Sequence, residues 1–148
     1  MSDSVLRLDS FLPYQLSIAS NAVSEMIALA YRQRFGISIA EWRIVAILGE
    51  GAPLTPREIG RRSRMDKVSV SRGAKMLEEK GLVERSAHDA DQRSHRLTLT
   101  RAGRDLYADV APQALAFEER LFGGFEPWER AALASFLRRA LAAVEACE

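Results

Sequence analysis

The stretch that decides the fold is residues 55–81, TPREIGRRSRMDKVSVSRGAKMLEEKG. It opens with TPRE at 55–58, a Ser/Thr-x-x-Glu capping pattern with proline at the first helical position, which predicts a short helix to about Arg62. Asp66 then suits the N-cap of a further helix that runs to Lys80. The pattern therefore predicts two short helices joined by a tight turn.

The second of these helices has two different faces. At about 100° per residue, Val70, Ala74 and Leu77 fall on one side, which is expected to pack against the rest of the domain. The other side carries residue types that read DNA, since arginine bonds guanine, hydroxyls bond bases or phosphates, valine contacts a thymine methyl and lysines neutralise phosphates. These candidate DNA-binding residues are Lys67, Val68, Ser69, Ser71, Arg72 and Lys75. The alternative interpretation is an ordinary solvated helix face.

A β-hairpin is expected directly after this helix. Residues 82–86 are short and extended, 87–94 are polar, and 95–100 alternate, with Leu97 and Leu99 on one face. We therefore predict two short strands with a long polar tip between them. Two short helices followed by a hairpin form the outline of a winged helix-turn-helix, whose second helix enters the major groove.

The hairpin tip adds candidate DNA contacts. An arginine on a projecting loop can insert into the narrow, electronegative minor groove, which makes Arg93 a candidate. Asp91 can orient it through a charge-assisted hydrogen bond, and His95 is placed with them on the wing. Thr55 and Arg64 are expected to contact the DNA backbone.

Long helices are predicted on either side of this segment. Apolar residues recur at three- and four-residue steps from Leu12 to Phe35, and SIAE at 38–41 repeats the capping pattern for a helix that ends near Gly49. Thr100 is expected to cap a helix to about 122, bent or interrupted at Pro112, and a last helix starts at 127. The predicted fold class is mainly α with a small β-hairpin wing (α+β).

Length and composition restrict the class of protein. The 148 residues correspond to about one domain, and 47% hydrophobic residues with a net charge of +1 exclude wholesale disorder. The chain has no apolar run long enough for a membrane span and no signal peptide pattern, so a cytoplasmic location without membrane contact is expected. Cys147 is the one cysteine, so no disulfide can form within a chain.

The small net charge hides an uneven distribution. Residues 57–104 hold 13 Lys/Arg against 7 Asp/Glu, whereas the rest of the chain holds 8 against 13. A basic centre between acidic flanks favours a local surface for a polyanion such as DNA, although a chance fluctuation of composition remains the alternative.

Several motifs together resemble the MarR family of bacterial transcriptional regulators. They are SIAEWR at 38–43, DKVSVSR at 66–72, LEEKGLV at 77–83, DQR at 91–93 and LTLTRAG at 97–103. The resemblance implies a homodimer that binds a pseudo-palindrome in double-stranded DNA. It divides the chain into a helical dimerisation region, residues 1–36 and 104–148, and a winged helix-turn-helix DNA-binding domain, residues 37–103.

The terminal helices fit a dimer because they carry large apolar residues and little basic charge. The alternative is that these helices cover each other within one chain. The residues expected to face a partner are Phe11, Leu12, Phe125, Trp128, Phe136 and Leu137.

Members of the family that the chain resembles often release DNA when a small aromatic or anionic effector binds, whereas others sense oxidants or metals. Oxidant sensors use a cysteine near the start of the first helix, and none lies there. A metal site is also disfavoured, because the two histidines, His88 and His95, both lie in the wing. An organic effector is therefore favoured, with ordinary packing as the alternative role of its candidate pocket residues. Those residues are Tyr14, Trp42, Arg43 and Tyr107.

No pattern in the chain favours an enzyme: it lacks a glycine-rich phosphate loop, a nucleophile motif and a His–carboxylate metal spacing. We therefore predict a sequence-specific DNA-binding regulator, in the form of a ligand-responsive homodimeric repressor without a resident cofactor. The main alternative is a winged-helix protein-docking module without specific DNA binding.

Overall fold

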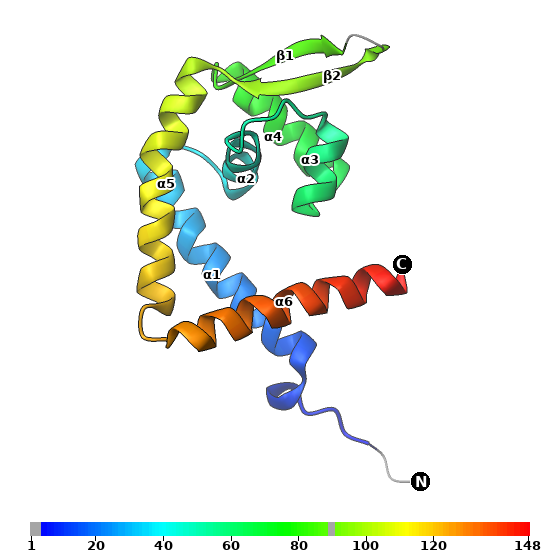
Figure 1. The fold of residues 1–148 in the computed structure, drawn as a ribbon, viewed down its shortest axis with the longest axis vertical. Helices are drawn as coiled ribbons and strands as arrows, with labels where there is room; N and C mark the ends of the chain where they lie inside the picture. The colour runs from blue at the N-terminus through cyan, green and yellow to red at the C-terminus, as the bar shows by residue number, and fades with distance from the viewer. Residues whose placement is uncertain (1–3, 89–90) are drawn as a thin grey trace. The chain divides into compact units, whose positions relative to one another are not determined.

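The computed structural model describes residues 4–88 and 91–148, and of residues 87, 88 and 91–94 it describes the backbone alone. Within this part the chain forms six α-helices, one short 3-10 helix and one two-stranded antiparallel sheet, so the predicted fold class is confirmed. Two compact units are present, Met1–Val110 and Ala111–Glu148. The elements are η1 (Leu8–Ser10), α1 (Leu12–Phe35), α2 (Ile39–Leu48), α3 (Pro56–Ser63), α4 (Lys67–Glu79), β1 (Val83–His88), β2 (Asp91–Leu99), α5 (Arg101–Phe122) and α6 (Pro127–Cys147) (Figure 1).

The helix ends follow local chemistry. Gly36 ends α1 in the left-handed conformation, with φ of 66°, and its N–H donates to the Arg32 carbonyl at 3.1 Å. At the start of α2, the Glu41 N–H donates to Ser38 Oγ at 3.1 Å, and the Ser38 N–H donates to Glu41 Oε2 at 3.4 Å. The predicted capping box is therefore confirmed, and it fixes where α2 begins.

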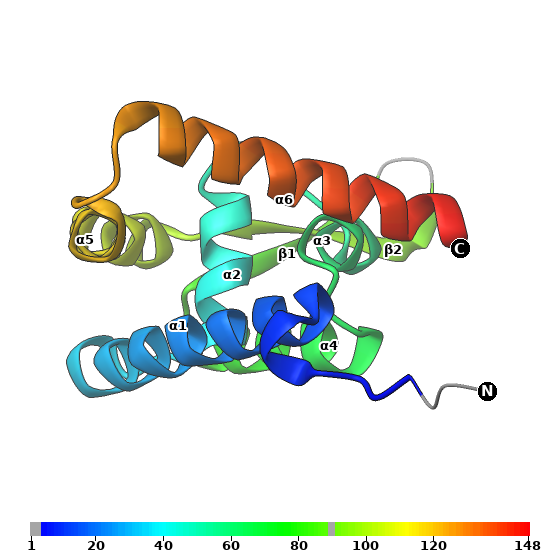
Figure 2. The ribbon, with the colours of Figure 1, turned by 90° about the horizontal axis from the view of Figure 1, so that it is seen from below.

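The core of the first unit lies among α2, α3, α4 and the base of the hairpin. These three short helices lie side by side in Figure 2, and the apolar side chains between them are almost fully buried. Such burial contributes roughly 1.5–3 kcal/mol per large side chain. The core residues are Ile44, Val45, Leu48, Leu54, Ile59, Val70, Ala74, Leu77, Val83, Leu97 and Leu99.

The hairpin is anchored to the loop between α2 and α3. The Leu97 N–H donates to the Leu54 carbonyl at 2.7 Å, and the Leu54 N–H donates back to the Leu97 carbonyl at 3.2 Å. This isolated bridge, which the sequence did not indicate, attaches β2 to the loop that leads into α3.

The strands of the hairpin are longer than predicted. β1 and β2 pair in register from Val83 opposite Leu99 to Ala87 opposite His95, and after an irregularity His88 pairs with Asp91. The long polar tip expected over 87–94 was therefore wrong for the described backbone. Backbone pairing does not need an apolar face, so the described ladder continues without a period-2 signal in the sequence.

Helix α5 crosses from the first unit into the second. Thr100 caps it as predicted, since its Oγ1 accepts from the Gly103 N–H at 3.1 Å. The helix continues through Pro112 without a break, so it is not interrupted there, whereas a bend at Pro112 stays a prediction. Proline removes one ladder bond, and ten helical residues precede Ala111 with ten after Pro112, which is enough helix on both sides to tolerate the loss.

The second unit pairs the end of α5 with α6. Arg130 joins them, because its Nε donates to the Phe122 carbonyl at 2.9 Å and its Nη2 lies 2.9 Å from Glu119 Oε2. The C-terminal half of α6 is exposed throughout. None of the described helices is long and apolar enough to cross a membrane.

Candidate nucleic-acid interface

The start of α4 is fixed by an aspartate. Asp66 accepts from the Ser69 N–H at 2.8 Å and from the Ser69 hydroxyl at 2.7 Å. The bond from the backbone N–H of Ser69, followed by the bond from its hydroxyl, lowers the pKa of Asp66 below its ordinary value. Asp66 is therefore an ionised N-cap, as predicted, and its negative charge also suits the positive end of the helix.

The inner face of α4 packs as predicted. Val70, Ala74 and Leu77 are at most 2% exposed. Gly73 lies on the same face, and a Cβ at this position would lie 2.9 Å from Ile44 Cδ1. A side chain here would therefore displace the end of the Ile44 side chain in the core between α4 and α2.

The outer face of α4 lies in solvent. Five of the six candidate DNA-binding residues are exposed, and Val68 is 62% exposed despite being apolar. Ser69 is half-buried, and its hydroxyl donates its one hydrogen to Asp66. The hydroxyl can therefore only accept a hydrogen bond from a further partner. The exposed residues are Lys67, Val68, Ser71, Arg72 and Lys75.

A groove of about 690 Å³ lies beside α4, between it, α3 and β1. Cationic side chains from all three elements line it, namely Arg57, Lys67 and Arg85, over a largely apolar floor that includes Met65 and Val70. Arg85 is held against α4 by an ion pair from its Nε to Glu78 Oε1 at 2.5 Å. The groove thus gathers positive charge next to the outer face of α4.

Arg57 and Arg85 were missed as site residues. Both belong to the basic segment 57–104, which was the one available signal, but the face of α4 was analysed alone. Their position depends on how α3 and β1 pack against α4, and helical spacing within α4 carries no information about that packing.

Thr55 and Arg64, the expected DNA backbone contacts, lie at the two ends of α3. Thr55 Oγ1 accepts from the Glu58 N–H at 3.2 Å, and the Thr55 N–H donates to Glu58 Oε2 at 2.8 Å. That backbone bond is the main reason why the pKa of Glu58 lies below its ordinary value. Arg64 is exposed and ends α3 in the left-handed conformation, with φ of 56°.

The wing residues are described only in part. The backbones of Asp91 and Arg93 belong to β2, but their side chains lie outside the described part of the structure. His95 is exposed on β2, opposite Ala87. Among the described residues, no cluster of three or more His, Cys, Asp or Glu could hold a metal ion.

Two of the four candidate effector residues lie together. The rings of Trp42 and Tyr107 stack with centroids 6.1 Å apart and planes inclined by 24°, and Tyr31 meets Trp42 edge-on at 5.6 Å. Tyr14 precedes Tyr31 by 17 residues on α1, or about 25 Å along the helix axis, so it does not reach this stack within the unit. Arg43 is exposed on α2.

A cavity of about 380 Å³ lies next to Tyr107, between the C-terminal end of α2, the end of β2 and the start of α5. Arg104 lines it, and its Nη1 donates to the Leu99 carbonyl at 3.1 Å. Gly49 also lines it, and a Cβ there would overlap the Tyr107 ring. The ring of Tyr107 therefore packs directly on the backbone of Gly49, and the guanidinium of Arg104 lines the same cavity.

Comparisons with known proteins agree with this architecture. Residues 35–94 match the sequence profile of the MarR family. A Bacillus subtilis protein, the uncharacterized HTH-type transcriptional regulator YwoH, is 29% identical over 104 residues, which cover 70% of this chain and 75% of that protein.

Solved structures give the same result. A MarR/EmrR family transcriptional regulator from Acinetobacter sp. ADP1 is 31% identical, with a TM-score of 0.88, over 95% of this chain and 99% of the other. Streptococcus pneumoniae FabT, solved in complex with DNA, shares the fold at 24% identity with a TM-score of 0.74, over 93% of this chain and 97% of that one. The profile match, the identity to the Acinetobacter protein over nearly its whole length and the winged arrangement of α3, α4, β1 and β2 together show that the chain belongs to the MarR family of DNA-binding transcriptional regulators.

Proposed function

We propose that the protein is a sequence-specific reader of double-stranded DNA that places α4 in the major groove. The observation that carries this proposal is the division of α4 into a buried face, with Val70, Ala74 and Leu77, and an exposed face of basic, hydroxyl and small apolar residues. Because the buried face fixes the helix in the domain, the exposed face is presented as a rigid reading surface. Arg72 is the residue proposed to bond a guanine, and Val68 the one proposed to contact a thymine methyl.

The groove beside α4 supplies the proposed backbone contacts. Arg57 and Arg85, which line the same groove beside α4, are proposed to neutralise phosphates together with Lys67. Thr55 and Arg64 are proposed to contribute at the ends of α3. On the wing, Arg93 is proposed to enter the minor groove, oriented by Asp91, with His95 near the phosphates.

The active form is proposed to be a homodimer that binds a pseudo-palindrome. Support comes from large apolar side chains exposed in both units: Leu12 is 75% and Trp128 is 71% exposed, and Phe136 is 59% exposed. Surfaces of this kind are normally covered by a partner. Residues 1–36 and 104–148 would then form the dimerisation region and residues 37–103 the DNA-binding domain. A monomeric mass by sedimentation at micromolar concentration would contradict the dimer.

The regulator is further proposed to act as a repressor that a small aromatic or anionic compound releases from DNA. The stacked Trp42 and Tyr107, with Arg104 at the neighbouring cavity, form a surface that suits an aromatic carboxylate. Such a compound acts only if it binds the DNA-free arrangement more tightly than the DNA-bound one. A panel of aromatic acids that changes neither Trp42 fluorescence nor DNA affinity would refute this part of the proposal.

The DNA-reading proposal is tested by selection from a random duplex pool with purified protein at about 0.15 M salt, where non-specific attraction is reduced. We expect enrichment of an inverted repeat whose half-sites lie about one helical turn apart. Affinity for the selected site should fall linearly with the logarithm of salt concentration, because phosphate contacts release counterions. No enrichment by folded protein would instead favour the protein-docking alternative, which has no counterion release.

A further inference from the structure

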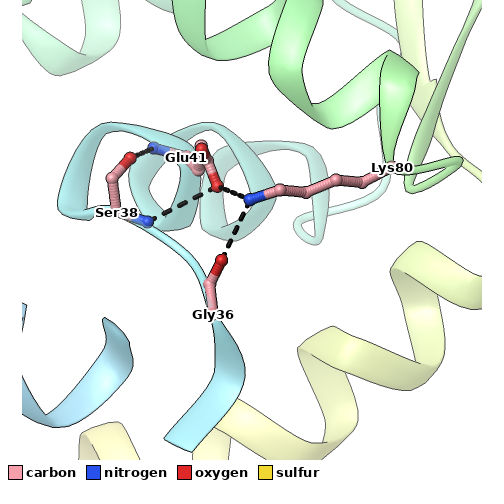
Figure 3. A network of polar contacts seen from close by, with 4 residues as sticks. All are labelled: Gly36, Ser38, Glu41 and Lys80. Carbon is pink, nitrogen blue, oxygen red and sulfur yellow. Dashed lines mark hydrogen bonds and ion pairs between the residues drawn. The ribbon is translucent and has the colours of Figure 1, made fainter. Parts of the chain in front are cut away.

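A partly buried ion pair lies at the C-terminal end of α4, away from the candidate reading residues. Lys80 Nζ lies 2.8 Å from Glu41 Oε2 and donates to the Gly36 carbonyl at 2.9 Å (Figure 3). The Glu41 side chain is 8% exposed and that of Lys80 is 33% exposed. One ammonium group therefore joins the C-cap of α1, the first turn of α2 and the C-cap of α4.

The Glu41 carboxylate makes a shorter contact with Lys80, on another helix, than with the Ser38 N–H that it caps. In the capping box of α3, the carboxylate oxygen of Glu58 lies 2.8 Å from its backbone N–H donor. In α2 the same bond, from the Ser38 N–H to Glu41 Oε2, is 3.4 Å long, whereas Lys80 lies 2.8 Å from that oxygen. The carboxylate thus lies nearer to the lysine than to the group that it caps, as Figure 3 also shows.

The residues after Lys80 hold the same end of α4 to α5. Gly81 turns the chain with φ of 72°, and its carbonyl accepts from the Thr100 hydroxyl at 2.6 Å. The Leu82 carbonyl accepts from the Thr100 N–H at 3.0 Å, directly before α5 begins. The C-terminal end of α4 is therefore bonded to α1 and α2 through the Lys80 side chain, and the residues that follow it are bonded to Thr100 through that residue's hydroxyl and backbone N–H.

A small rotation at this end has a large effect at the other. The 13 residues of α4 span about 20 Å, so a pivot of about 10° about its C-terminal end moves its N-terminal residues by roughly 3 Å. That displacement is close to the rise of about 3.4 Å between successive base pairs. Lys80 therefore holds α4 at its C-terminal end, whereas the candidate DNA-binding residues lie toward its N-terminal end, where a rotation causes the largest displacement.

We propose that Lys80 is a positioning residue, which fixes the direction of α4 relative to α1 and so sets the half-site spacing that the dimer accepts. This inference rests on the proposed function, in which two copies of α4 read two half-sites. A partly buried ion pair of this type contributes little net stability, because the desolvation of the buried carboxylate offsets much of the attraction between the charges. Its contribution here is to orientation.

The test uses the double variant Glu41→Gln/Lys80→Met, which removes both charges and retains a side chain that can cap α2. Lys80→Met alone would leave an unpaired buried carboxylate and confuse orientation with stability. Each protein is measured on the selected inverted repeat and on versions with one base pair added or removed between the half-sites. The matched control is Glu50→Gln/Arg62→Met, which removes an exposed ion pair of 3.4 Å within the same unit.

The wild-type protein is expected to prefer the selected spacing at least tenfold. The Glu41→Gln/Lys80→Met variant should lose at least three-fold of that preference, while its Tm and its affinity for an isolated half-site stay near the wild-type values. The control variant should keep the full preference, even if its affinity falls uniformly through loss of Arg62. Glu41→Gln alone, which keeps the bond from Lys80 to the Gly36 carbonyl, should lose part of the preference and provides a second, milder variant.

A full spacing preference in both Glu41→Gln and the double variant would overturn the inference while leaving the proposed function intact. A loss of half-site affinity in parallel with Tm would also overturn it, since that pattern means a purely structural role. If the wild-type protein selects no spaced repeat, the proposed function fails and the inference fails with it. The outcomes for the wild-type protein and for the variants therefore separate the two.

Discussion

Gly103→Ala is expected to destabilise the first unit, and the size of this destabilisation follows from the contacts of Gly103. Gly103 is buried in the first turn of α5. A Cβ there would overlap the Leu82 carbonyl oxygen and lie 3.1 Å from the Leu82 carbonyl carbon and 3.2 Å from Leu99 Cδ2. The Leu82 carbonyl cannot rotate away freely, because it accepts from the Thr100 N–H at 3.0 Å. The added methyl group must therefore separate α5 from the end of α4.

Three contributions set the magnitude. Overpacking costs about 1–3 kcal/mol, and weakening the Thr100–Leu82 hydrogen bond costs about 1 kcal/mol. Alanine returns up to about 1 kcal/mol by restricting the unfolded chain. The free energy of unfolding should therefore fall by about 1–4 kcal/mol. In a protein of this size that fall corresponds to a Tm lower by roughly 2–16 °C.

The matched control is the same substitution at Gly60, inside α3. A Cβ there would lie 3.6 Å from the Met65 carbonyl oxygen and 3.7 Å from Val70 Cγ2, which are ordinary contacts. Gly60→Ala should therefore raise stability by about 0.5–1 kcal/mol through helix propensity. Urea unfolding followed by circular dichroism, at one protein concentration, measures both. A Gly103→Ala variant within about 0.5 kcal/mol of wild type would refute the steric argument.

Three further predictions concern the interface. The bonds from Ser69 lower the pKa of Asp66, so the ionised cap stabilises the fold above the ordinary pKa of aspartate, and this stabilisation is lost as pH falls through the pKa of the folded state. Asp66→Asn should therefore reduce the loss of stability with falling pH below about pH 4. Urea unfolding at several pH values measures this, and an unchanged dependence of the unfolding free energy on pH would contradict it. Arg72→Ala should weaken binding to the selected site by about 1–3 kcal/mol, with the exposed Arg138→Ala as control, and equal losses on selected and random DNA would exclude a base contact. Arg93→Ala should weaken binding most on sites whose flanking base pairs are A·T-rich. Equal losses of affinity with all flanking sequences would indicate that Arg93 contacts a phosphate.

Features set by neighbouring residues were predictable from the sequence. Ser38 and Thr55 each lie three residues before a glutamate, and Asp66 precedes a helix with a regular apolar face, so the starts of α2, α3 and α4 could all be placed. The division of α4 into two faces followed from the same helical periodicity. Both predictions depend only on chemistry within about one helical turn.

Features that join distant segments were not predictable in this way. Leu54 and Leu97 form a bridge across 43 positions, and Lys80 reaches Glu41 across 39. Charge alone offered many possible partners for Lys80, and only the packing of α4 on α2 decides among them. The length of β1 and β2 was missed for another reason, because the polar sequence at 87–94 has no apolar alternation that would predict backbone pairing.

The motif LEEKGLV at 77–83 therefore encodes geometry more than DNA contact. Leu77 is buried, Glu78 holds Arg85, Lys80 bonds Glu41, and Gly81 makes the left-handed turn; these contacts set the direction of α4 and its connection to the wing. The proposed reading residues lie separately, at 67–75. A chain that shares this motif is expected to share the orientation of the helix, whereas the base sequence that it prefers is set by the other end of the helix. Exchanging 67–75 between two such regulators should accordingly transfer base preference and leave the preferred half-site spacing with the recipient.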